Sequence, residues 1–137
     1  NVTPLTTLVA TQPTLKTKLD ELGGWNADIA SPTGVPGKLL RVAKTVETYW
    51  QVSTDLTSDS KKQLLALENL ALTLKNNNLP TDAVNLKAIT STAIETSMND
   101  NKIYTNSNGF SKLAIKKMVE KAVNNIRQNV INIFLVV

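Results

Sequence analysis

The sequence contains no cysteine and no histidine among its 137 residues. Without cysteine, the chain forms no disulfide and offers no thiolate for catalysis or metal binding. Without histidine, it lacks the commonest metal ligand and the commonest general base in proteins. Catalytic triads built on either residue are therefore excluded, and a zinc site of the usual composition is not expected.

Short enzyme motifs are also missing. The sequence has no Gly-rich phosphate loop and no nucleophile elbow. Segment 99–109 is rich in Asn, but Asp100 is its only carboxylate, and no bidentate Glu closes the segment as a calcium loop requires. We therefore predict that the protein is not an enzyme, holds no metal and needs no cofactor.

Aromatic residues make up only 4% of the chain, and the formal net charge is a mild +4. Stacking surfaces for bases are scarce, so nucleic-acid binding is not expected. No apolar run approaches the roughly 20 residues that a transmembrane helix needs. Ser, Thr and Asn are abundant while charged residues make up only 19%. This balance favours a secreted or cell-surface protein.

Five segments repeat apolar residues at helical spacing, and no strand-like alternation competes with them. Their approximate ranges are 4–22, 37–55, 57–76, 82–99 and 111–134. Capping residues precede them, and Gly, Asn or Pro follows several of them. A chain of this length can bury a real core within one domain. We predict an all-α bundle of about five helices, forming a single domain over residues 1–137 without disulfides.

Two positions allow alternative interpretations. Pro13 either kinks one helix over 4–22 or opens a second helix capped by Thr11, and the unbroken apolar phase favours the kinked helix. Segment 23–37 is a loop rich in Gly and Pro that carries Trp25. It either folds back on the core or forms a lid over a pocket.

The segment 57–76 is the most apolar part of the chain, and it carries two sets of apolar residues. One broad helical stripe contains Leu64, Ala66, Leu67, Leu70, Ala71 and Leu74. Leu65 and Leu72 form a second, narrow ridge, which favours a central helix with neighbours on two sides. Glu68 is either an ordinary exposed acid or a partly buried acid facing an internal cavity.

The segment after residue 110 holds a surplus of positive charge. It contains one acid, Glu120, and five basic residues: Lys112, Lys116, Lys117, Lys121 and Arg127. The simpler interpretation is a solvated helix face, and the alternative is binding to an anionic surface.

Two functional hypotheses follow from this pattern. In the first, the bundle binds an apolar small molecule, such as a fatty acid, in a cavity between helices. Its expected walls are Trp50, Leu65, Leu72, Ile89, Ile126 and Val130, and Arg41 or a lysine of the last helix would meet the head group. In the second, the extra ridge of the central helix contacts another protein, in a monomer or a weak homo-oligomer. Trp50 could equally fill the core.

Overall fold

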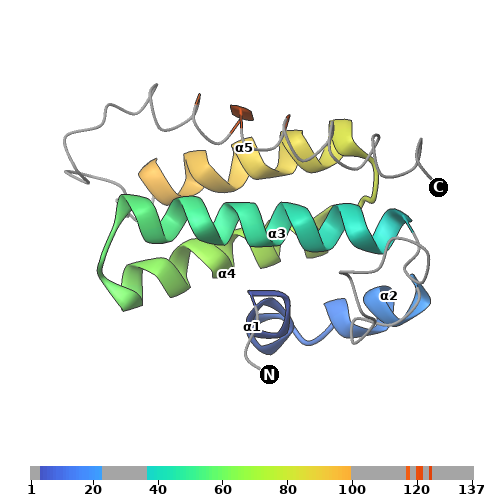
Figure 1. Ribbon diagram of the computed structural model, residues 1–137. Coiled ribbons are helices and arrows are strands. Elements are labelled where there is room, and N and C mark those ends of the chain that lie inside the picture. The colour runs from blue at the N-terminus through green and yellow to red at the C-terminus, as the bar shows by residue number, and fades with distance from the viewer. Residues whose placement is uncertain (1–3, 23–36, 100–116, 118–119, 122–123, 125–137) are drawn as a thin grey trace.

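The computed structural model describes residues 4–22 and 37–99, together with 117, 120, 121 and 124 (Figure 1). It contains α1 (Pro4–Thr11), α2 (Leu15–Glu21), α3 (Gly37–Leu56), α4 (Ser60–Asn76) and α5 (Ala83–Asn99). These described ranges contain no strand, and the predicted all-α bundle of about five helices is confirmed. The expected loop 23–37 lies almost wholly outside the described residues, as does most of the expected helix 111–134.

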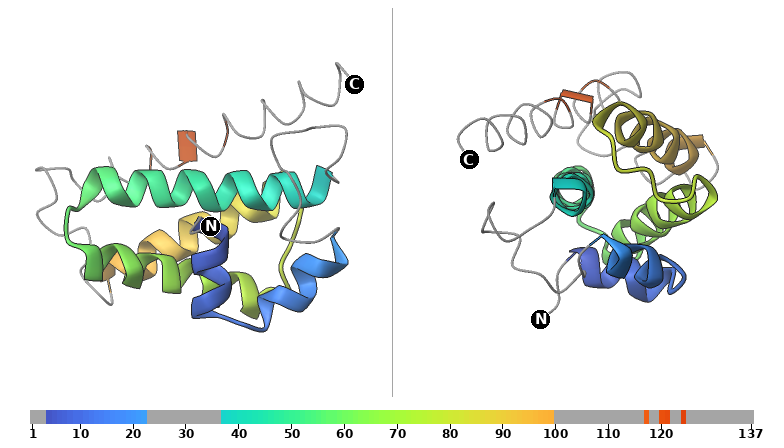
Figure 2. Two further views of the ribbon diagram at one scale, coloured as in Figure 1. Left: turned by 60° about the horizontal axis from the view of Figure 1, so that its bottom comes forward. Right: turned by 90° about the vertical axis from the view of Figure 1, so that its right-hand side faces the viewer.

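The three long helices lie side by side, and the two short helices cover one side of them (Figure 2). α4 contacts α5 most extensively and also packs against α1 and α3. α3 in turn contacts α1 and α5. α3 and α4 therefore each contact three other helices of the described bundle.

The N-terminal segment is two helices rather than one kinked helix. Pro13 has no N–H and cannot continue the α1 ladder. The chain turns there, with Leu15 N donating to Gln12 O at 3.0 Å and Lys16 N donating to Pro13 O at 3.1 Å. The expected single helix is therefore wrong, and Thr14, not Thr11, precedes the second helix. The helical spacing of the apolar residues was correctly predicted, as the buried leucines of both helices show. They are Leu5, Leu8, Leu15 and Leu19.

α4 begins at a side-chain cap and buries one continuous stripe. The Asp59 carboxylate accepts a hydrogen bond from Lys61 N at 3.0 Å, which satisfies an otherwise unpaired N–H of the first turn. The buried residues are Ala66, Leu67, Leu70, Ala71 and Leu74. This set matches the predicted stripe except for Leu64, which lies at the edge of the stripe and is 41% exposed.

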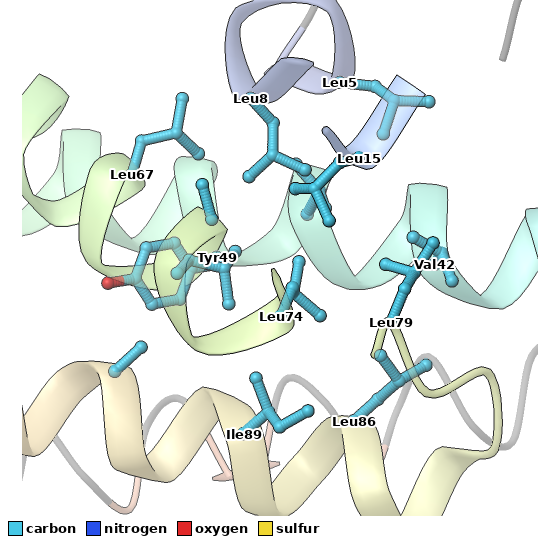
Figure 3. Close-up of a cluster of buried hydrophobic side chains, with 14 of the residues drawn as sticks. Leu5, Leu8, Leu15, Val42, Tyr49, Leu67, Leu74, Leu79, Leu86 and Ile89 are labelled. Atoms are coloured by element: carbon cyan, nitrogen blue, oxygen red, sulfur yellow. The ribbon is translucent and has the colours of Figure 1, made fainter. Parts of the chain in front are cut away.

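Tyr49 joins α3 to α4 in the middle of the core (Figure 3). Its ring is buried, and its hydroxyl donates to Ala66 O at 2.7 Å. A buried phenol needs such an acceptor, because an unpaired polar group in the core is costly. Tyr49 belongs to the buried inner face of α3. The buried residues of that face are Leu39, Val42, Ala43, Val46, Tyr49 and Ser53.

Buried hydroxyls are satisfied inside their own helices. Thr45, Ser53, Thr90 and Ser97 are buried, and each hydroxyl donates to the carbonyl four residues earlier at 2.7 to 2.9 Å. No buried side-chain nitrogen or oxygen of the described residues lacks a partner. This local bonding explains how α5, with its low helix propensity, packs a face containing Thr and Ser against α4.

α4 ends in a turn that places two non-glycine residues in the left-handed region. Asn78 has φ 57° and Leu79 has φ 50°. Leu79 N donates back to Leu74 O at 2.8 Å, and the Leu79 side chain is buried in the core. The turn therefore closes the helix and anchors it, at the expense of backbone strain.

We expect Tyr49→Phe to lower the free energy of unfolding by about 1 kcal/mol, because one buried hydrogen bond is lost while the ring stays packed. Tyr49→Ala should lower it by about 3–5 kcal/mol, because it also leaves a cavity. Urea denaturation followed by circular dichroism measures both values. Equal losses for the two variants would contradict this account of the Tyr49 hydroxyl.

The strain at Asn78 gives a second expectation. Asn78→Gly should raise the free energy of unfolding by about 0.5–1 kcal/mol, because glycine adopts positive φ without steric cost. Asn77→Gly is the matched control, since Asn77 has φ −108° and gains nothing from glycine. Thermal and urea denaturation of both variants provide the comparison, and a stabilised Asn77→Gly protein would contradict the explanation.

Candidate functional site: the outer face of α4

Four of the six residues expected to line an internal cavity lie within the described residues. Trp50 is partly buried against the core, and Ile89 is buried within it. Leu65 and Leu72 are 41% and 47% exposed, contrary to the internal position expected for them. Ile126 and Val130 lie outside the described residues.

Helix geometry explains the exposure of the two leucines. Each residue advances a helix by about 100°, so Leu65 and Leu72 lie about 140–160° around the axis from Leu67 at the centre of the buried stripe. The buried stripe of α4 faces the bundle core, and Asn69, which lies outside that stripe, donates from Nδ2 to Ser97 Oγ of α5 at 2.9 Å. The second ridge is exposed and does not face a second neighbour among the described helices.

Charged residues run beside these leucines. Lys61, Glu68 and Lys75 repeat at intervals of seven residues, and all three are exposed. They lie between Leu64 on one side and the Leu65–Leu72 line on the other, at about 80–120° from Leu67. Glu68 thus has the exposed position of the simpler interpretation. Together these residues define the outer face of α4: Lys61, Leu64, Leu65, Glu68, Leu72 and Lys75.

Arg41, the expected head-group ligand, has a structural partner. Its Nε donates to Thr81 O at 2.7 Å, which ties α3 to the connection between α4 and α5. The side chain is half-buried. Binding of a ligand head group by Arg41 stays a prediction, and the observed contact gives the residue a role in the fold.

Asp82 caps α5 next to this contact. Its carboxylate accepts hydrogen bonds from Asn85 N at 3.0 Å and from Asn85 Nδ2 at 2.9 Å. The backbone N–H of Asn85, then its side chain, and to a smaller extent the nearby Arg41 charge, hold the pKa of Asp82 below its ordinary value of 3.8. The sequence signal for this cap was an Asp three residues before an Asn.

A shallow hollow lies where the end of α4 meets the start of α5. Its volume is ≈ 280 Å³, and it is open to solvent. Asparagine and threonine side chains share its lining with apolar ones: Asn77, Pro80, Asn85, Ala88, Ile89 and Thr92. It includes only Ile89 of the expected cavity walls, and its mixed lining does not resemble a site for an acyl chain.

The basic segment near the C-terminus is described at four positions only. Lys117 and Lys121 are exposed, which fits a solvated face. Glu120 lies against α5, where Ser91 Oγ donates to its carboxylate at 3.5 Å. Arg127 and the other lysines of this segment lie outside the described residues.

No protein-family model matches the sequence, and neither a curated protein nor a solved structure is similar to it. Among the residues that the structure describes, no helix is long and apolar enough to cross a membrane. The same residues include no group of three acidic side chains able to hold a metal ion. The chemistry of the surface itself is therefore the basis for a function.

The Asp82 cap predicts a pH dependence of stability. A carboxylate whose folded pKa is depressed stabilises the fold above its unfolded pKa, and this contribution is lost as pH falls through the folded value. As the pH falls below about 4, the free energy of unfolding should therefore decrease less for Asp82→Asn than for the wild-type protein. Urea midpoints of both proteins across this range measure the difference, and parallel curves would contradict the role of Asp82.

Proposed function

We propose that this protein is a non-enzymatic interaction module that binds a partner chain through the outer face of α4. The observation that carries the proposal is the exposure of Leu65 and Leu72 on the side of α4 opposite its buried stripe. Single exposed leucines are ordinary on protein surfaces, but these two share one line along the helix and form a short apolar strip, with Leu64 across the charged row from them.

The spacing of the strip suits another helix. Leu65 and Leu72 are seven residues apart, which places them about 10.5 Å apart along the α4 axis. Leucines at this interval are the anchors that a helix presents to a helix in coiled coils and helix-in-groove complexes. The strip is short, so we expect a small interface of the kind found in transient complexes.

Fatty-acid binding between the helices remains a prediction. It requires an enclosed apolar space, and two of its expected walls, Leu65 and Leu72, are exposed instead. The remaining candidates include Ile126 and Val130, which lie outside the described residues. The exposure of the two leucines therefore supports the interaction module in preference to the carrier.

The experiment introduces a photo-crosslinking amino acid at position 72 and, as a control, at position 84. Val84 is 65% exposed, lies on α5 and is not one of the residues that define the outer face of α4. Irradiation of the cells that produce the protein should give a defined adduct from position 72, and Leu65→Glu in the same chain should abolish it. An adduct that forms equally from position 84, or that survives Leu65→Glu, would contradict the proposal.

Binding is then measured with the purified partner. The double variant Leu65→Glu/Leu72→Glu should weaken the Kd by about 100-fold, because two apolar anchors are lost, while Val84→Glu should leave it unchanged. Both variants should keep the thermal midpoint of the wild-type protein, since their side chains are exposed. Native mass spectrometry of the purified protein tests the carrier hypothesis separately, through any retained lipid.

A further inference from the structure

The charged row of the outer face restricts what kind of helix can lie there. Lys61, Glu68 and Lys75 alternate in sign and follow the Leu65–Leu72 line at the same interval of seven residues. A helix docked on the leucines must therefore pass this row along its length. Like charges placed opposite one another across such a seam are unfavourable, and opposite charges select the partner and its register.

A second copy of the chain fits this row poorly. In an antiparallel pair with each Leu65 opposite the Leu72 of the other copy, two-fold symmetry brings Lys61 beside Lys75 and Glu68 beside its own equivalent. In a parallel pair, two-fold symmetry places the two rows on opposite sides of the seam, so Glu68 faces no charge of the other copy's row. Sliding the antiparallel pair by seven residues pairs Lys61 with Glu68, but it leaves Leu72 without an apolar partner.

We infer, on the basis of the proposed function, that the partner is a different chain: an amphipathic helix with leucines seven residues apart and an acidic–basic–acidic row beside them. An Asp or Glu of that helix pairs with Lys61 and another with Lys75, while a Lys or Arg pairs with Glu68. The pairs lie at the solvated rim, where each contributes modestly. The leucines therefore supply most of the affinity, and the charged row supplies the choice of partner.

Two designed helical peptides of about three heptads test the inference. Both peptides have the same leucine pattern and a similar amino-acid composition. They differ in the row beside the leucines, which is Glu–Lys–Glu in one and Lys–Glu–Lys in the other. Fluorescence anisotropy with the full chain should show about tenfold tighter binding of the Glu–Lys–Glu peptide at low salt. High salt should reduce this difference, because the pairs are exposed.

A charge-swapped protein provides the matched control. Lys61→Glu/Glu68→Lys/Lys75→Glu keeps all three leucines and should reverse the peptide preference. Equal binding of both peptides, lost in Leu65→Glu/Leu72→Glu, would overturn this inference and leave the proposed function standing. Absence of binding by either peptide would count against both. Sedimentation could also show a dimer that forms with rising concentration and is lost when Leu72 is substituted. That result would overturn the inference in favour of a second copy of the chain.

Discussion

The hydrogen bond from the Tyr49 hydroxyl to Ala66 O fixes the relation between α3 and α4, on which the remaining packing depends. A phenol can be buried at this depth only if its O–H has an acceptor, and a helix carbonyl can accept a second bond in few directions. The donor lies on α3 and the acceptor on α4, so the bond constrains both the register and the rotation of the two helices.

Once α4 is held in that rotation, the exposure of its outer leucines is unavoidable. Turning the helix to bury Leu65 and Leu72 would expose Leu67, Leu70 and Leu74, and would remove the acceptor of Tyr49. Full burial of a leucine contributes about 1.5–3 kcal/mol, so exchanging three buried leucines for two is unfavourable even before the hydrogen bond is counted. The outer leucines therefore contribute little to the stability of the described bundle, and their side chains are available for another contact.

Sequence periodicity predicted the helices well, because a repeat of apolar residues reports the phase of a helix directly. It predicted the buried stripe of α4 almost completely, with Leu64 as the exception. At Pro13 it favoured one kinked helix, which was wrong, because a kink and a break both keep the leucines in phase. It does not show that Asp82 rather than the adjacent Thr81 caps α5, since the Arg41 contact with Thr81 O is made across the fold.

The same limit explains the candidate site. A helix with apolar residues on two sides has the same pattern whether its second side meets another part of its own chain or the surface of a partner. The pattern gives the position of the second ridge around the helix axis. Only the tertiary structure shows what lies next to the helix at that position. In the described bundle, the inner stripe of α4 is buried, Asn69 bonds to α5, and the second ridge lies beside a row of alternating charge. A lipid chain would gain nothing from such a row, whereas a helix of complementary charge would be aligned by it, and this difference favours a protein partner.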